Sequence, residues 1–218
     1  MKFKKEMLLL YAVTDRGNDS SAAFYKKIED ALRGGVTLVQ LREKNISEDE
    51  FIEKAVKVKE ICRRFSVPLI INDSVEVALR SGADGVHVGV TDTAVGEIRK
   101  KVSSDFIIGA TAKTVIQAQM AEKEGADYLG VGAVFQSPTK KDALRITTEQ
   151  LKEICVSVSI PVVAIGGINS DNIFELSGAG IAGVAVISAL FSAENVQAAG
   201  HELRAKAEMA VSSEYFVR

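Results

Sequence analysis

The segment SGADGVHVGV, at residues 81–90, shares its plan with EGADYLGVGA at 124–133 and SGAGIAGVAV at 177–186. Each segment ends a predicted helix at a glycine and then enters a predicted strand whose small residues permit tight packing. A second plan, in which proline precedes a strand, occurs in SVPLIIND at 66–73 and in SIPVVAIGG at 159–167. The sequence therefore indicates a repeated unit of strand and helix.

The remainder of the chain continues this alternation. Apolar runs of strand length alternate with amphipathic segments of helix length, one of which opens with a capping box between Ser47 and Glu50. The runs lie at about 8–14, 36–42, 68–72, 84–89, 105–109, 127–132, 161–166 and 182–187. Eight such repeats predict a (β/α)8 TIM barrel.

We expect one domain over residues 1–218, with a C-terminal helix or tail from about residue 191. The structural alternative is a doubly wound open sheet. Against it, no G-x-G-x-x-G motif follows the first predicted strand.

Composition limits the classes of partner and compartment. The 27 basic and 29 acidic residues give a net charge of −2, which offers no support for nucleic acid or a membrane surface as a partner. The lysine-rich start passes through a short apolar run directly into Asp15, which favours a buried strand over a signal peptide.

Cys62 and Cys155 lie far apart in predicted helices, so we expect inert thiols and a cytoplasmic setting. A barrel of this size often self-associates, so a homo-oligomer is one expectation.

Polar and small residues follow the predicted strands. In a TIM barrel the carboxyl ends of the strands form the active-site face, so these residues should meet there. In VTLVQLREKN, at 36–45, alternate residues share a direction, and Gln40, Arg42 and Lys44 should all point into the same place. The full set comprises Gln40, Arg42, Lys44, Asn72, Asp73, Asp92, Thr111, Ser137, Thr139, Lys140, Lys141, Gly166, Gly167, Ile187 and Ser188.

These residue types indicate two phosphorylated ligands. Arg42, Lys44 and Lys140 supply positive charge for phosphate oxygens. Asp73 and Asp92 suit Mg²⁺, which usually takes one or two carboxylates together with substrate phosphate oxygens. This combination implies a diphosphate, and the glycines and small residue after the last two strands form the usual monophosphate site of such barrels. A transferase that expels pyrophosphate is predicted.

Each group also has a purely structural explanation. Arg42 could pair with Glu43, and Asn72 and Asp73 could cap the next helix. His87 alternates with valines inside a strand, so we expect a packed, hydrogen-bonded core residue, and we expect His201 to lie at the surface. Neither a zinc site nor a protein nucleophile with its base is indicated.

Several motifs together resemble the thiamin phosphate synthase (thiamine-phosphate pyrophosphorylase) family. They are YAVTDR, LVQLREK, IIND, GADGVHVG, GADYLGVGAVF followed by SPTK, and IPVVAIGGI, and the resemblance runs from about Leu10 to Leu190. The family joins a hydroxymethylpyrimidine diphosphate to a phosphoethyl thiazole, here in its carboxylate form, and releases pyrophosphate by a dissociative, magnesium-assisted reaction.

The resemblance implies a role for each matched position. The residues that would bind the diphosphate and pyrimidine are Gln40, Arg42, Lys44, Asn72, Thr111 and Lys140, among which Arg42, Lys140 and Thr111 would be catalytic. The metal ligands would be Asp73 and Asp92. The residues that would bind the thiazole phosphate are Ser137, Thr139, Gly167, Ile187 and Ser188.

The sequence also departs from the family pattern. Val90 stands where glutamine is common, Lys113 where histidine is frequent, Ser74 where arginine is frequent, and Thr111 where serine is usual, while Gln136 and Ser137 replace a proline–threonine pair. Three rival functions therefore stay open. They are a paralogue that isomerises the thiazole precursor, a non-catalytic regulator, and a sugar-phosphate isomerase or epimerase.

Overall fold

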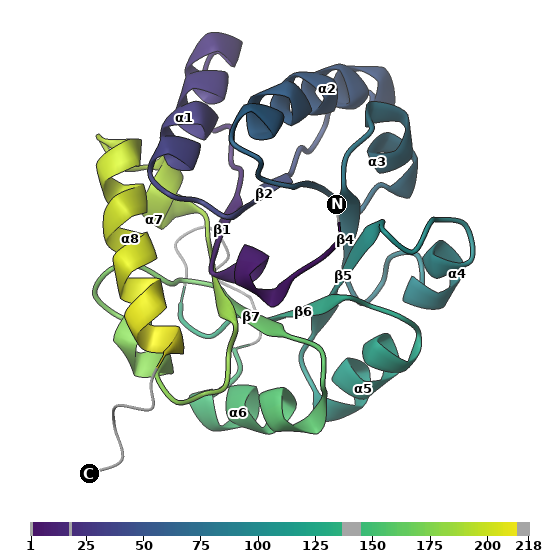
Figure 1. The fold of residues 1–218 in the computed structure, drawn as a ribbon, viewed down its shortest axis with the longest axis vertical. Coiled ribbons are helices and arrows are strands. Elements are labelled where there is room, and N and C mark those ends of the chain that lie inside the picture. The colour runs from purple at the N-terminus through teal and green to yellow at the C-terminus, as the bar shows by residue number, and fades with distance from the viewer. Residues whose placement is uncertain (1, 18, 137–144, 213–218) are drawn as a thin grey trace.

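Eight parallel strands form a closed barrel in sequence order, and β8 pairs back onto β1 through Leu10 and Val184 (Figure 1). This computed structural model describes residues 2–17, 19–136 and 145–212. The strands are β1 (Leu10–Val13), β2 (Leu38–Leu41), β3 (Leu69–Asn72), β4 (Gly85–Val88), β5 (Ile107–Ala112), β6 (Tyr128–Gly132), β7 (Val162–Ile165) and β8 (Gly183–Val186). The predicted TIM barrel is confirmed, and the open-sheet alternative is wrong.

Helices surround the barrel, as Figure 1 shows. They are α1 (Ser21–Arg33), α2 (Glu48–Arg64), α3 (Val75–Ser81), α4 (Val95–Arg99), α5 (Val115–Lys123), α6 (Thr148–Ser157), α7 (Ser188–Phe191) and α8 (Val196–Val211), with short 3-10 helices η1 (Lys5–Leu8) and η2 (Ile173–Leu176). Helix α8 packs closely on the end of α1. A Cβ added at Gly34, which follows α1, would lie only 2.7 Å from the carbonyl oxygen of Gln197 on α8.

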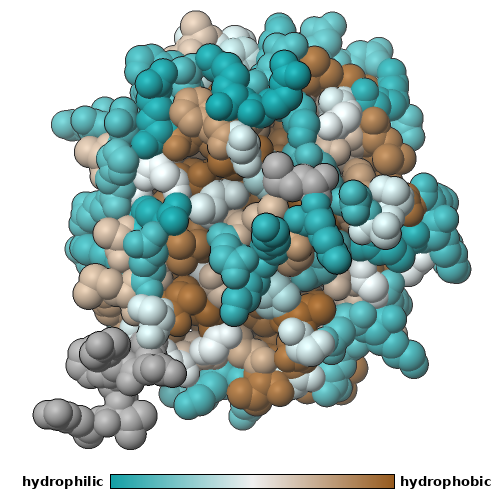
Figure 2. Space-filling view, viewed as in Figure 1, coloured by the Kyte–Doolittle hydropathy of each residue, from teal (hydrophilic) through white to brown (hydrophobic). Residues whose placement is uncertain are grey.

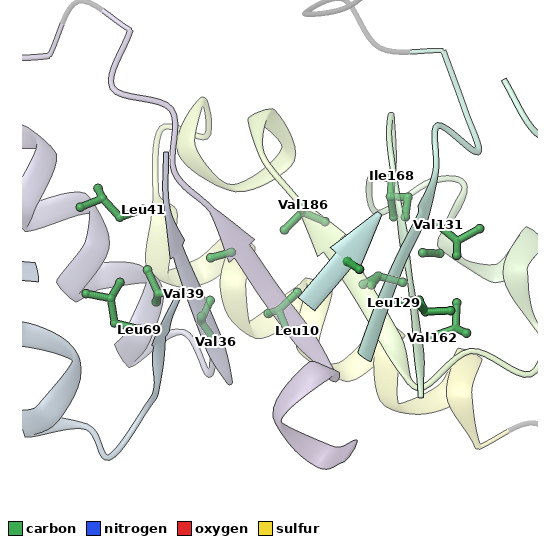
Figure 3. Close-up of a cluster of buried hydrophobic side chains, with 14 of the residues drawn as sticks. Leu10, Val36, Val39, Leu41, Leu69, Leu129, Val131, Val162, Ile168 and Val186 are labelled. Carbon is green, nitrogen blue, oxygen red and sulfur yellow. The ribbon is translucent and has the colours of Figure 1, made fainter. Parts of the chain in front are cut away.

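The alternation of side chains along each strand creates two cores. Outward residues such as Leu10, Val39 and Leu129 belong to a large cluster between the strands and the helices, and Figure 3 shows these side chains on their strands. Inward residues form a smaller cluster inside the barrel, with Tyr11 and Tyr128 as its largest members. Burial of both clusters provides the main stabilisation of the fold.

The N-terminal segment covers one end of the barrel. Figure 1 shows η1 lying across the opening that faces the viewer, and the ring of Phe3 stacks on Tyr128 with 5.7 Å between the ring centroids. Leu8 is fully buried in the inner cluster. A ligand therefore has access from the opposite end, where the strands terminate.

The helix signals in the sequence correspond to local structure. The capping box between Ser47 and Glu50 is present at the start of α2, and Ala55, Val58 and Cys62 form its buried side. On the face seen in Figure 2, hydrophilic side chains cover much of the surface and hydrophobic ones lie among them. Of the helices in the described ranges, none has the length and apolar character needed to cross a bilayer.

Candidate active site

A cavity of about 490 Å³ opens at the carboxyl ends of the strands. It is bordered by side chains or backbone from most of the strands, and a ligand inside it would touch opposite sides of the barrel. The predicted site residues that line this cavity are Gln40, Arg42, Lys44, Asn72, Thr111, Gly166, Gly167, Ile187 and Ser188. Gln40 and Ser188 both border this cavity. The barrel therefore brings together residues that lie far apart in the sequence.

The cations after β2 are available to a ligand. The backbone N–H of Arg42 donates to Thr14 Oγ1 at 3.0 Å, which fixes the end of β2 against β1. Glu43 does not pair with Arg42, because it forms a nearly buried ion pair with Lys54 on α2, at 3.2 Å. Within the described residues, neither Arg42 nor Lys44 has a carboxylate within ion-pair distance. The structural explanation for Arg42 is therefore wrong, and both cations can attract an anion.

A second cavity of about 390 Å³ adjoins the first on the β1–α1 side. Arg42, Lys44 and Asp15 border both cavities, and Arg16 adds a further cation to the second one. Among the residues that the structure describes, the charged side chains that border the two cavities are thus concentrated beside β2.

Two carboxylates meet beside Asn72. Partial burial, together with the neighbouring carboxylate of Asp92, raises the pKa of Asp73 to about 6, although Asn72 and Arg42 act in the opposite direction. The Nδ2 of Asn72 donates to Asp73 Oδ2 at 2.6 Å, and Asp92 Oδ2 accepts from the backbone N–H of Gly89 at 2.7 Å. Asp73 has a φ of 64°, in the left-handed region that aspartate adopts more readily than most residues with a side chain.

This pair fits a divalent cation. Two adjacent like charges repel, and a bound cation would relieve that repulsion. Across the ranges that the structure describes, no group of three or more His, Cys, Asp or Glu side chains could hold a metal ion. The Asp73–Asp92 pair would therefore leave coordination positions for ligand oxygens and water, which matches the preference of Mg²⁺.

The opposite side of the cavity is formed by backbone. Gly166 and Gly167 have φ values of 105° and 66°, and a Cβ at Gly167 would lie 2.5 Å from the carbonyl oxygen of Gln136. Asn172 Nδ2 donates to the carbonyl of Gly167 at 2.9 Å and holds the turn. Ser188 begins α7, whose first N–H groups have no acceptor within the helix. This end of the cavity can donate backbone hydrogen bonds to an oxyanion.

Five tyrosine, histidine and polar side chains form a connected set below the cavity, which we call the floor network: Gln40, Tyr11, Tyr128, His87 and Thr111. Gln40 Nε2 lies 2.6 Å from Tyr11 Oη, which lies 2.8 Å from Tyr128 Oη. His87 Nδ1 lies 3.1 Å from Tyr128 Oη, and its Nε2 lies 3.1 Å from Thr111 Oγ1. The expected hydrogen bonding of His87 is confirmed, but its ring also borders the cavity.

Electrostatics keep the floor network neutral. Burial lowers the pKa of His87 to about 4, so the imidazole carries no charge near neutral pH. Burial likewise raises the pKa of Tyr11, and it raises the pKa of Tyr128 well above its usual range. The floor of the cavity therefore offers hydrogen bonds rather than charge.

Sequence reasoning missed Tyr11 and Tyr128. Their inward position follows from strand alternation, but their meeting across the barrel depends on glycines at 109 and 130, where an added Cβ would collide with Tyr128 or His87.

Thr111 was expected just past its strand, and this was wrong. Strand β5 continues to Ala112 because it pairs with β6 as far as Val131.

Four of the predicted site residues lie outside the described residues: Ser137, Thr139, Lys140 and Lys141. Among the positions that depart from the family pattern, Lys113 lines the cavity, Ser74 caps α3 through a bond from the N–H of Val77, and Val90 is 53% exposed.

Known proteins resemble this chain along nearly its whole length. The family model described as thiamine monophosphate synthase matches residues 10–190. "Thiamine-phosphate synthase 2" of Streptococcus pneumoniae is 50% identical over 194 residues, which cover 89% of this chain and 92% of the relative. "Thiamine-phosphate synthase" of Enterococcus faecalis is 50% identical over 192 residues, covering 88% and 90%.

Solved structures agree with the sequence comparisons. Thiamine phosphate pyrophosphorylase from Pyrococcus furiosus superposes with a TM-score of 0.87 at 40% identity, covering 95% of this chain and 98% of that one. A 3-hexulose-6-phosphate synthase superposes with a TM-score of 0.71 at 15% identity, which shows a shared fold alone. The chain therefore belongs to the thiamine monophosphate synthase family of transferases.

Proposed function

We propose that this enzyme joins a hydroxymethylpyrimidine diphosphate to a phosphoethyl thiazole, in its carboxylate form, and releases thiamin phosphate, pyrophosphate and carbon dioxide. The observation that carries the proposal is a single cavity with a glycine turn on one side and, on the other, cations that form no ion pair with any described residue. A diphosphate and a monophosphate are the ligands that such a cavity complements.

The diphosphate would bind beside β2 and β3. Arg42 can bind two phosphate oxygens at once through its planar guanidinium, and Lys44 adds a mobile point charge. Asn72 borders the cavity and connects it to Asp73 through their hydrogen bond. By resemblance to the family, Lys140 would complete this set of cations.

Asp73 and Asp92 would hold Mg²⁺ next to the diphosphate. When bound, the ion would supply positive charge to the leaving group. Asp73 must lose its proton to serve as a ligand, and the charge of Arg42 favours that loss. Asn72 would orient the Asp73 carboxylate through the bond to Oδ2.

The thiazole phosphate would bind at the other side of the barrel. Backbone N–H groups at Gly167 and at the Ile187–Ser188 junction would receive its phosphate oxygens. The family resemblance adds Ser137 and Thr139 as contacts to the thiazole. The two substrates would thus meet above the floor network.

The reaction would be dissociative. The bond between the pyrimidine methylene carbon and the diphosphate oxygen breaks, pyrophosphate takes the electron pair, and the thiazole nitrogen then attacks the methylene cation. The thiazole carboxylate leaves as carbon dioxide, and a proton from solvent takes its place on the ring. Arg42 and Lys44 would stabilise the charge that develops on the leaving group, and the cavity would hold the two rings in line.

Both cysteines support a mechanism without a covalent enzyme intermediate. Burial raises the pKa of Cys62 to about 12 and that of Cys155 to about 11, so both remain thiols near neutral pH. Both are free, which fits a reducing compartment such as the cytoplasm.

Release of pyrophosphate tests the proposal. We expect release only when both substrates and Mg²⁺ are present, and loss of release after chelation. Conversion of the thiazole phosphate by itself, with no pyrophosphate formed, would instead assign the chain to the isomerising paralogues.

A further inference from the structure

The hydroxyl of Tyr11 sets the direction of hydrogen bonding in the floor network. With the amide oriented as it is in the structure, Gln40 Nε2 donates to the Tyr11 oxygen at 2.6 Å. Tyr11 then keeps one hydrogen of its own and is only 1% exposed, so that hydrogen needs a buried acceptor. Among the described residues the acceptor in reach is Tyr128 Oη, at 2.8 Å. Tyr11 therefore donates to Tyr128.

Donors and acceptors can be assigned in the same way from Tyr128 through His87 to Thr111. Tyr128 has no exposed surface, and its remaining hydrogen can go to His87 Nδ1 at 3.1 Å. A ring that accepts at Nδ1 is a neutral imidazole whose proton sits on Nε2. That Nε2–H donates to Thr111 Oγ1, also at 3.1 Å. The hydroxyl hydrogen of Thr111 is then left for a partner in the cavity.

We infer that the floor network donates in one direction, from Gln40 to Thr111, and so makes the Thr111 hydroxyl a fixed hydrogen-bond donor to the ligand. Tyr11, Tyr128 and His87 act as positioning residues that set this polarity. The ligand atom above Thr111 must then be an acceptor, either a phosphate oxygen or an aromatic ring nitrogen. The inference rests on the proposed function only for the identity of that ligand.

The opposite direction conflicts with the structure at Tyr11. If Thr111 donated to His87 and His87 to Tyr128, then Tyr128 would donate to Tyr11. The Tyr11 hydrogen would face the N–H of Gln40 and would have no acceptor among the described residues. An unpaired donor at a buried position is unfavourable. The orientation of Gln40 and the polarity of Thr111 are therefore linked across the barrel.

The tautomer of His87 tests the inference without any substrate. The chain has two histidines, so ¹⁵N-histidine labelling gives a simple spectrum, and His201→Gln identifies the signals of His87. Near pH 7 we expect a neutral ring protonated at Nε2. In Tyr128→Phe the preference for this tautomer should be lost, whereas Tyr25→Phe, which removes a phenol from α1, should leave the spectrum unchanged. A wild-type ring protonated at Nδ1, or at both nitrogens, would overturn the inference.

Binding measurements then identify the acceptor. The probes are inorganic pyrophosphate with Mg²⁺ and the hydroxymethyl aminopyrimidine without phosphate. Thr111→Val should weaken one of them about five- to tenfold, as expected for one lost neutral hydrogen bond, and Thr111→Ser should restore most of the affinity. Loss for pyrophosphate assigns a phosphate oxygen, and loss for the pyrimidine assigns a ring nitrogen. Unchanged affinity for both probes in Thr111→Val would contradict a donor role, whether or not the enzyme turns over.

Discussion

Acidification should destabilise the barrel through His87. An ordinary histidine has a pKa of 6.5, and burial lowers the pKa of His87 to about 4. Above pH 6.5 the ring is neutral in both the folded and the unfolded chain, so it contributes no pH dependence. Between these two values the unfolded chain binds a proton that the folded chain does not, so the free energy of unfolding falls as the pH falls. At about 1.4 kcal/mol per pKa unit, the loss reaches about 3 kcal/mol near pH 4.

Urea denaturation at pH 7 and near pH 4, on wild type and His87→Gln, measures this contribution. Other acidic groups act alike in both proteins, and any pH-independent cost of the substitution cancels when each protein is compared with itself. We expect the acid-induced loss to be smaller in His87→Gln by about 3 kcal/mol. His201→Gln, an exposed change on α8, should behave as wild type. Equal pH dependence in wild type and His87→Gln would refute the buried, neutral histidine.

Four further substitutions test the site and its support. Arg42→Ala and Lys140→Ala should each abolish turnover with an unchanged melting temperature; near-normal activity in both would remove the diphosphate pocket from the account. Asp73→Ala should lose activity and also the rise in melting temperature that Mg²⁺ gives the wild type, whereas an active, magnesium-responsive variant would exclude Asp73 as a ligand. Gly109→Ala should lower the free energy of unfolding by about 1–3 kcal/mol, because its Cβ would lie 2.5 Å from His87 Nδ1 and collide with Tyr128; an unchanged urea midpoint would contradict that packing.

The fold was predictable because the repeated unit fixes both the order and the type of each element. The glycine-ended helices and the apolar runs place all eight strands, and the observed bounds fall close to the predicted ones. The clearest difference is β5, which was expected to end at Gly109 and extends to Ala112. Gly109 resembled a strand end, but it stays inside the strand and leaves room for the Tyr128 ring.

Strand alternation allowed part of the site to be predicted, namely which side chains point into the cavity. Alternation puts Gln40, Arg42 and Lys44 on one side, and all three line the cavity. It does not show which side chains meet across the barrel, so the contact between Tyr11 and Tyr128 was missed. Nor does it reveal that Glu43 turns to Lys54 and leaves Arg42 available. Such pairings depend on the closure of the barrel and the twist of neighbouring strands.

Binding of the product pair tests the central claim, that one cavity receives both phosphorylated groups. The direct measurement is a crystal structure with thiamin phosphate, pyrophosphate and Mg²⁺. We expect pyrophosphate against Arg42 and Lys44, the metal between Asp73 and Asp92, and the phosphate of thiamin phosphate at Gly167 and Ser188. Density for either phosphate group outside this cavity, or a metal bound away from the two carboxylates, would contradict the account.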